Sequence, residues 1–513
     1  MPFISSRILM LALLLFTSLT SSAISIKNEQ SVIVIGAGLT GLSAALELQE
    51  SGLQVTVLEA GAHMAKPVYS FSSDFIQGLG DNSRPIQSDD IRYEKEHEQV
   101  HGYLALAGLQ VTDSAIKDSD QISALISETA INTAKDSLNS LYYLDGKLIS
   151  FQDLNRIFAQ NISPDYQRFW QAFNQLTPKQ VSKLEAEIEA QHKLDQPYSL
   201  QLSQPLSSQG WLNSLELHPT ALKLATHHIE GMYGEISKMS ALSLANQQKS
   251  HHHEGDRQAQ VQRIIGGDSL MANALADKLN KPVLLNQNIT SIEHNKAGVV
   301  IKANGKTFSA KQLLITQALP DLAKLNISPA LPDRILSSSQ HLNYGAYNKV
   351  LLQYQAGFMA LVNASNNQAL PMGWNVAQSR DSTPLNPTLV TYTAGGLIDG
   401  QTYNSSEHII AIKRAQLAAK FPGIDQMFVS ANVQAWHREP WPGGNYITYK
   451  EQEIKTYWNN FKLPVGNIYF ASGQFDNRFA GTFAGAARVG IQTAKTISQH
   501  VYIKASSKLA SGY

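Results

Sequence analysis

The chain has 513 residues, which is enough for one large two-domain enzyme or about three core-sized units. Hydrophobic residues make up 43% of it and charged residues 16%, and the 41 Lys and Arg balance the 41 Asp and Glu. This composition argues against a disordered chain, a basic nucleic-acid binder and an acidic tail protein. With no cysteine, the chain forms no disulfides, thiolate metal sites or Fe–S clusters.

The first residues have the pattern of an export signal. Nine apolar residues, 8–16, follow Arg7, and Ser21 and Ala23 are small residues suited to a cleavage site. Nine residues are too few to cross a bilayer, which needs about 20. We therefore expect a signal peptide at residues 1–23 and an exported protein, periplasmic or secreted, without a stable membrane span. An uncleaved N-terminal anchor is the alternative interpretation.

Residues 31–60 contain the parts of a dinucleotide-binding unit in the required order. A short β-branched run at 32–35 predicts a buried parallel strand. Gly36, Gly38 and Gly41 follow it with the spacing GxGxxG. In this motif the first glycine allows a tight turn, the second lets a pyrophosphate approach the backbone, and the third lets the next helix pack on the strand.

The rest of this unit supplies an acid for a ribose. A second predicted strand, 55–58, ends at Glu59, whose carboxylate can accept hydrogen bonds from both ribose hydroxyls and disfavours a 2′-phosphate. The amides at the start of the intervening helix suit the phosphates, and Ala37 belongs to the same loop. The motif alone does not distinguish FAD from NAD.

The later chain alternates between helical and strand patterns. Residues 91–258 are mostly helical in pattern, with proline breaks. Further on we expect helices at 269–279 and 406–420, and strands at 283–285, 289–293, 298–303, 306–308, 312–316 and 347–354. The strands at 298–303 and 306–308 predict a hairpin that turns at Asn304-Gly305. A strand at 467–472, a glycine-containing loop at 473–482 and a helix at 483–500 form a second strand–loop–helix unit.

With these segments in this order, the chain resembles the flavin-containing amine oxidase family, which includes monoamine, polyamine and L-amino-acid oxidases. Residues 32–60, 264–320, 344–354 and 468–494 carry the resemblance. It implies an α/β fold in which a Rossmann-like FAD-binding domain is interleaved with an α+β substrate domain. The FAD domain would comprise residues 30–90, 259–320 and 445–500. The substrate domain, with a helical insertion, would comprise residues 91–258 and 321–444.

The resemblance also assigns roles to individual residues. It implies that Gly36, Gly38 and Gly41 hold the FAD pyrophosphate, Glu59 the adenosine ribose, and the backbone at Ile289 the adenine. Gly473, Gln474 and the amide of Thr482 would lie against the pyrophosphate, ribityl chain and isoalloxazine. Lys349 matches the lysine that holds a water near flavin N5.

Two readings of Lys349 differ in its burial. A lysine on a strand can simply point into solvent. The neighbouring Val350, Leu352 and Tyr354 instead predict a buried strand, on which an ammonium group requires a function.

Three features depart from the family pattern. After Glu59 the family has Gly-Gly-Arg, whereas residues 61–71 read GAHMAKPVYSF, and neither His63 nor Lys66 can reproduce a guanidinium fork. The C-terminal strand leads into Gly473-Gln474, where the family has Gly-Glu. Since the chain has no cysteine, FAD is expected to bind noncovalently.

The family reaction moves a hydride from the carbon of a neutral amine to flavin, which O2 reoxidises to give H2O2. We expect a small amine or amino acid as substrate, with Trp441, Tyr446 and Phe475 as candidate aromatic walls beside Trp436 and Phe483. If the substrate is an amino acid, Arg84 is the candidate for its carboxylate.

Rival interpretations concern metals and other functions. Residues 251–256 (HHHEGD) and the pair His97 and His101 are read as solvated segments, so no metal site is expected. A desaturase or isomerase on the same fold, acting on an apolar substrate, is one functional alternative. A degenerate, non-catalytic family member is the other.

Overall fold

The structure is a computed structural model of the whole chain. It describes residues 30–64, 70–71, 86–87, 98–114, 141–144, 147–150, 163–176, 207–251, 261–264, 269–316, 319–344, 347–355, 374–376, 388–394, 405–421, 423–435, 447–450, 453, 457, 460–476 and 478–510. The expected signal peptide lies outside these residues. No helix within the described ranges is long and apolar enough to cross a bilayer.

A parallel four-stranded sheet organises the N- and C-terminal parts of the chain. Its strands are β2 (Gln54–Leu58), β1 (Ser31–Ile35), β12 (Gln312–Ile315) and β20 (Ile468–Phe470), in that order. The three segments that supply these strands are far apart in the sequence. The predicted strands at 32–35, 55–58 and 312–316 are confirmed, and so is the α/β fold class.

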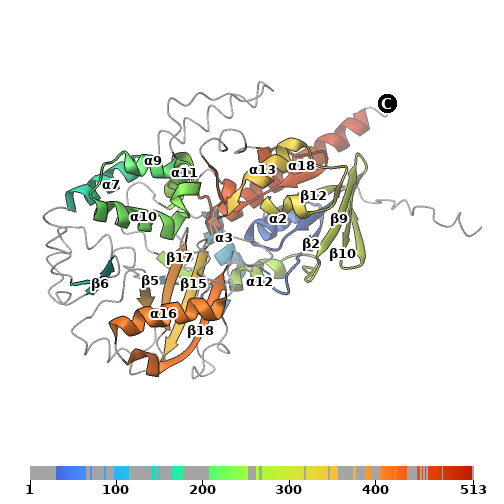
Figure 1. The fold of residues 1–513 in the computed structure, drawn as a ribbon. Coiled ribbons are helices and arrows are strands. Elements are labelled where there is room, and N and C mark those ends of the chain that lie inside the picture. The colour runs from blue at the N-terminus through green and yellow to red at the C-terminus, as the bar shows by residue number, and fades with distance from the viewer. Residues whose placement is uncertain are drawn as a thin grey trace, which may run out of the picture.

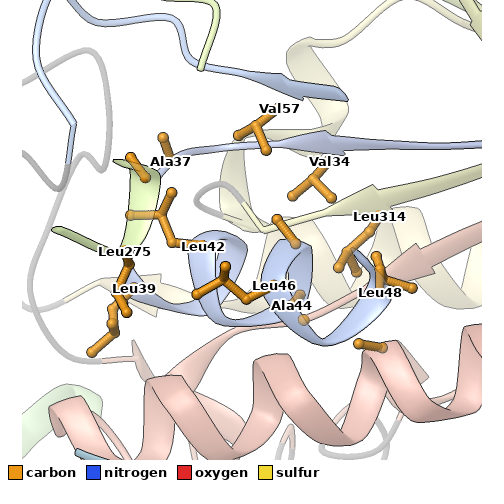
Figure 2. Packing of buried hydrophobic residues seen from close by; sticks show 14 of the residues in the cluster. Val34, Ala37, Leu39, Leu42, Ala44, Leu46, Leu48, Val57, Leu275 and Leu314 are labelled. Carbon is orange, nitrogen blue, oxygen red and sulfur yellow. The ribbon is translucent and has the colours of Figure 1, made fainter. Parts of the chain in front are cut away.

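Successive side chains of these strands point to opposite faces of the sheet and so pack into two different cores. Val32, Val34 and Leu314 pack against α2 (Leu39–Glu50) and α18 (Phe483–Ala510) on one face. Figure 2 shows this face, with Leu42 and Leu46 of α2 turned toward the strands. Ile33 and its alternating neighbours pack on the opposite face against a second sheet. The central strands are therefore buried on both sides, which explains their continuous apolar runs.

That second sheet is mixed: β9, β10 and β11 are antiparallel neighbours, and β13 pairs with β9 in parallel. Its strands run in the order β11 (Lys306–Ala310), β10 (Gly298–Ala303), β9 (Ile289–Asn295) and β13 (Ile327–Ser328). The predicted hairpin turn is confirmed, because Asn304 and Gly305 both have positive φ, 45° and 74°.

A third sheet, from the middle of the chain, is antiparallel. It contains β16 (Trp374–Val376), β17 (Thr388–Ala394), β15 (Tyr347–Tyr354) and β18 (Phe428–Ala435) in that order. Helix α16 (Ser406–Lys420) covers one face of it (Figure 1) and packs on Val350, Leu352 and Tyr354. The bounds of β15 and α16 agree with the sequence prediction.

A helical cluster lies beside this sheet (Figure 1). It contains α7 (Ser163–Gln175), α9 (Ser208–Asn213), α10 (Pro219–Tyr233) and α11 (Ala241–His251), packed around aromatic side chains of Phe169, Phe173, Trp211 and Tyr233. The remaining elements are α3 (Glu98–Ala107), α12 (Ser269–Asp277), α13 (Asp333–His341), and the strand pairs β3–β4 (Ser70–Phe71, Ile86–Gln87), β5–β8 (Val111–Ser114, Val261–Ile264), β6–β7 (Leu141–Leu144, Lys147–Ser150) and β14–β19 (Asn343–Tyr344, Ile447–Thr448).

Some boundaries differ from the expected ones. Two helices assigned to the substrate domain pack with the parallel sheet instead: α3 through Val100 and Leu104, and α13 through Ile335. The expected strand at 283–285 contributes only one bridge, between Leu284 and Leu58. Amphipathic pattern alone does not show which of two neighbouring cores a helix joins, because either core would bury its apolar face equally well.

Helices α2 and α18 run parallel and touch through a glycine. A Cβ on Gly490 would lie 2.4 Å from the Thr40 carbonyl oxygen, and at the far end Tyr502 donates a hydrogen bond to the carbonyl of Ser51. The contact is backbone against backbone, so no flexible side chain can yield to an added methyl group.

Gly490→Ala is therefore expected to lower the free energy of unfolding by about 1–3 kcal/mol, by overpacking. The matched control is Gly102→Ala in α3, where a Cβ meets nothing within 4 Å. That variant should gain about 0.5–1 kcal/mol from helix propensity. Urea denaturation measures both, and equal effects at the two sites would contradict the close approach.

Lys413 lies on the sheet-facing side of α16, only 7% exposed, and none of the described residues gives it a hydrogen bond or an ion pair. Burial lowers its pKa from 10.5 to about 8. Between these two values the unfolded chain binds more protons than the folded one, so stability rises with pH across that window.

Lys413→Met is expected to stabilise the protein at pH 7 by about 2–3 kcal/mol, because the buried charge is removed. The gain should shrink as the pH rises from 8 to 10.5. Thermal unfolding across this range measures it, with the exposed Lys296→Met as the control. A gain that does not depend on pH would show that packing, rather than charge, is responsible.

Candidate functional site

The glycine loop after β1 is built for close backbone contact. Gly36 has φ 101°, a value that favours glycine. A Cβ on Gly41 would lie 1.9 Å from the Gly36 carbonyl oxygen, so α2 can begin this close to the strand only because residue 41 is a glycine. Thr316, directly after β12, donates its hydroxyl to the Ile35 carbonyl (2.8 Å) and thereby braces the same loop.

The N-terminus of α2 has the features of an anion site. Its N-cap is Gly38, with no side-chain cap, and a Cβ there would meet nothing within 4 Å. The helix dipole and the N-terminal amides thus face space that a phosphate could occupy. This open cradle fits the pyrophosphate of a dinucleotide such as FAD.

Glu59 braces the loop from the end of β2. One carboxylate oxygen accepts the amide of Ala37 (2.8 Å) and the other accepts that of Gly61 (2.7 Å). Each oxygen retains a second lone pair. The residue expected to bind the ribose therefore also fixes the shape of the glycine loop, and the expected phosphate contact of the Ala37 amide competes with this bond.

The segment before β9 runs alongside the end of β2. Leu284 forms a bridge with Leu58, and the amide of Gln287 donates to the Glu59 carbonyl (2.8 Å). Ile289, the residue expected to face the adenine, begins β9 two residues later. It lies at the correct end of the site for an adenosine, and its contact with adenine stays a prediction.

Strand order gives the direction of an extended dinucleotide. Ligands of open parallel sheets bind outside the carboxyl ends of the strands. With Glu59 at the end of β2 and the glycine loop at the end of β1, this rule predicts that the second nucleotide half would extend over β12 and β20. The loop after β20, which contains Gly473 and Gln474, lies at that end.

The loop 473–482 packs tightly on the last helix. A Cβ on Gly473 would lie 2.8 Å from Cα of Ala486. Thr482 caps α18, since its hydroxyl oxygen accepts the Gly485 amide (3.1 Å). The Thr482 amide donates to the Phe479 carbonyl (3.1 Å), so the group that we expected to face the cofactor already has a partner within the loop.

Sequence analysis missed the buried acid of this loop. Asp476, 2% exposed, accepts the amides of Arg478 (2.8 Å) and Phe479 (2.6 Å) and pairs with Arg488 of α18 (3.1 Å). An acid at the start of a loop, with glycines on either side, is a signal for such a turn. The partner Arg488 could not be read from the sequence.

The two helix N-termini point to the same edge of the sheet but are staggered. Gly490 packs beside Thr40, so α18 begins about six residues before α2 does along their common direction. At 1.5 Å per residue the offset is about 9 Å. Two positive helix ends therefore face the site at different points along an extended ligand.

The β14–β19 pair connects the two halves of the molecule. Tyr344 of β14 lies opposite Ile447 of β19, and the Ile447 amide donates to Oε1 of Gln474 (3.3 Å). Lys349 follows Tyr344 by five residues and so lies within roughly 17 Å of it. The Lys349 end of β15 is thus held near the loop after β20.

Lys349 is buried, with 2% of its surface exposed. It lies on the central strand β15, opposite Tyr392 of β17 and Gln434 of β18. The reading as a solvent-facing lysine is therefore excluded, and its contact with a water near flavin stays a prediction.

The face of the third sheet that carries Lys349 combines polar side chains with the buried Leu351. Gln353, 1% exposed, accepts the hydroxyl of Ser430 (2.9 Å), and Asn432 and Gln434 share this face by register. The opposite face is the apolar core with α16. Buried polar side chains on one face only are typical of a ligand-facing wall.

The other candidates divide into two groups. Phe475 stacks on Phe461 (centroids 5.6 Å apart) and Phe483 packs in the core beside α2, so both contribute at least partly to packing. His63 is exposed, His101 lies half-buried on α3, and His251 ends α11. Outside the described residues lie Arg84, Trp436, Trp441, Tyr446, Lys66, His97 and residues 252–256. Among the described positions, no group of three His, Asp or Glu side chains is arranged to hold a metal.

Two glycine variants distinguish the loss of space for a ligand from the loss of helix packing: Gly38→Ala and Gly41→Ala. Gly38→Ala is expected to change the free energy of unfolding by less than about 0.5 kcal/mol, yet to weaken FAD binding at least about tenfold, because the methyl group occupies the phosphate cradle. Gly41→Ala should lower stability as well, since it pushes α2 off the strand. Denaturation without cofactor and fluorescence titration with FAD distinguish the two; unchanged FAD affinity in Gly38→Ala would place the pyrophosphate elsewhere.

Comparisons with known proteins agree with this geometry. Residues 103–498 match the family Flavin containing amine oxidoreductase, and residues 31–99 match an FAD binding domain. Polyamine oxidase 5 of Oryza sativa subsp. japonica is 24% identical over 92% of this chain and 89% of its own length. L-amino-acid oxidase of Mus musculus is 22% identical over 92% of this chain and 71% of its own length.

The fold is also that of a solved oxidase. Cyclohexylamine oxidase from Brevibacterium oxydans IH-35A superposes with a TM-score of 0.69 at 17% identity, over 93% of this chain and 100% of that one. Since the family match extends over most of the sequence and residues 31–99 match an FAD binding domain, the chain belongs to the flavin-containing amine oxidoreductase family, with FAD as its cofactor.

Proposed function

We propose that the protein oxidises a small amine or amino acid by hydride transfer to FAD, with O2 as the final acceptor and H2O2 as product. One observation carries the proposal: the buried Lys349 lies on a sheet face with further polar side chains, and its strand is joined, through β14 and β19, to the loop after β20. This link between segments far apart in the chain supports a role for Lys349 near the reactive half of the cofactor.

Bound FAD supplies the acceptor for the hydride at N5. The chain supplies position and exclusion of water. The N-terminus of α2 would hold the pyrophosphate, and the N-terminus of α18 would favour negative charge farther along the cofactor. The Lys349 ammonium can hold a water or orient the amine through its donors, and the burial of Lys349, Leu351 and Gln353 limits the access of bulk solvent there.

The side chains on the Lys349 face of the third sheet are relevant to the class of substrate. The described polar residues of this face beyond Lys349 include carboxamides and a hydroxyl, from Gln353, Ser430, Asn432 and Gln434, and the apolar Leu351 lies among them. Relatives include oxidases named for polyamines and for L-amino acids. We keep both amines and amino acids as substrate classes, with Trp441 and Tyr446 as proposed aromatic walls and Arg84 as the proposed carboxylate partner.

We also propose that the protein is exported. The apolar stretch 8–16 behind Arg7 supports export of the protein. Expression with and without residues 1–23, followed by fractionation, tests it: retention of the full-length chain inside the cell would oppose export.

The activity is tested with purified, FAD-loaded protein and a panel of monoamines, polyamines and amino acids, with H2O2 detected by a coupled peroxidase. At least one class is expected to give peroxide and a carbonyl product in equal amounts. Turnover of a polyene without peroxide would favour the desaturase or isomerase alternative. A chain that holds FAD but oxidises none of these compounds would support the non-catalytic alternative.

Lys349→Met keeps the length of the side chain and removes its donors. Turnover is expected to fall by about 10²–10⁴-fold, the range typical of one positioned proton-transfer or water-holding group. FAD affinity should change little, because no cofactor-holding role falls to this residue. Stopped-flow reduction of the flavin by amine measures the effect, and Lys302→Met, exposed on β10, is the control. A reduction rate equal to wild type would remove Lys349 from the mechanism.

A further inference from the structure

Three distant segments meet at one residue, Ile447. Its amide donates to Oε1 of Gln474 in the loop after β20 (3.3 Å). Its carbonyl accepts Nε2 of Gln247 from α11 (2.8 Å). Because the N–H and C=O of an extended residue point to the same side, both carboxamides lie along one edge of β19, opposite β14.

Helix α11 continues along this edge in place of a neighbouring strand. Ser243 accepts the Tyr449 amide through its hydroxyl (3.1 Å), and the Ser240 amide donates to the Tyr449 carbonyl (2.8 Å). Residues 240, 243 and 247 are spaced i, i+3, i+7, so one polar face of the helix follows the strand. Ser240, Ser243 and Gln247 are each at least 96% buried. The edge is therefore rigid, and it fixes the carboxamide oxygen of Gln474.

Gln474 lies at the reactive half of the cofactor site. Strand order puts the adenosine over β2, at Glu59, and the other half over β12 and β20. Gln474 follows β20 by four residues, in the loop that leads to the N-terminus of α18. This placement follows from topology, independently of the side-chain role that the family resemblance gives.

We propose that Gln474, uncharged and held by Ile447, raises the reduction potential of the bound FAD above the value that a carboxylate at this position would give. Reduction adds negative charge to the flavin, and a nearby carboxylate opposes that charge in a partly buried site. The positive N-terminus of α18 acts in the same direction. Gln247 is the positioning residue, because it occupies the Ile447 carbonyl and so fixes how Gln474 pairs with this residue.

This inference depends on FAD binding and not on amine oxidation. The potential is measured with a chemical reductant in the absence of any amine. The inference about the potential can therefore hold in a protein that oxidises no amine. It can also fail in a protein that is shown to oxidise amines.

The decisive comparison is the midpoint potential of FAD in the wild type, in Gln474→Glu and in Gln492→Glu. Gln492 is exposed on α18, so its substitution changes net charge equally at a distance from the loop. Gln474→Glu is expected to shift the potential to a more negative value, and Gln492→Glu to leave it unchanged. A tenfold loss of affinity for reduced relative to oxidised FAD corresponds to about 30 mV. A Gln474→Glu protein with the wild-type potential overturns the proposal.

A second pair of variants decides the matter if Gln474→Glu does not take up FAD. Gln247→Met keeps the length of the side chain but cannot donate to Ile447. Gln248→Met is the matched control, because Gln248 is also buried in α11 but its amide binds Asn174 (3.2 Å). Gln247→Met should shift both the potential and the visible absorption band of bound FAD, and Gln248→Met neither. Wild-type values for both in Gln247→Met overturn the proposal.

Discussion

Two backbone contacts, each possible only at glycine, control how the cofactor half is assembled. Gly41 lets α2 approach within contact of the Gly36 carbonyl, and Gly490 lets α18 approach the backbone of α2 at Thr40. Together they hold α2 between the parallel sheet and the last helix. Since both helix N-termini then face the carboxyl edge of the sheet, the anion-binding character of that edge depends on these two close approaches.

The site is braced internally by acids that are directed toward backbone amides. Glu59 holds Ala37 and Gly61, and Asp476 holds the amides of Arg478 and Phe479. A carboxylate that accepts amide hydrogens fixes a loop without the help of a ligand. The two loops at the ends of β1 and β20 are consequently braced by the chain's own groups, and such bracing reduces the ordering cost of binding.

The substrate half is attached to this frame through a short strand pair. β14 and β19 are two residues each, and β19 is held on its second edge by side chains of α11 and by Gln474. A helix face thus replaces a strand where the third sheet, the helical cluster and the cofactor loop meet. This junction connects the strand that carries Lys349 and Gln353 to the loop after β20.

The sequence by itself determined the local units. The glycine spacing, the acid at Glu59, the hairpin turn at Asn304-Gly305, and the spans of β15 and α16 follow from periodicity and turn chemistry, which act over a few residues. The burial of Lys349 was also readable, because its strand neighbours are apolar. The family resemblance, which joins four such units in order, supplied FAD.

Only the tertiary structure decided which distant units meet. The pairing of Asp476 with Arg488, the contact of Gln474 with Ile447, the row of polar residues along α11, and the packing of α3 and α13 on the cofactor half all join segments separated in sequence. Local patterns carry no information about these partners, because an apolar face or a polar side chain is satisfied by any complementary surface. In the folded protein, each such face or side chain meets one particular partner. Close packing and the direction in which each loop leaves its strand determine which partner that is.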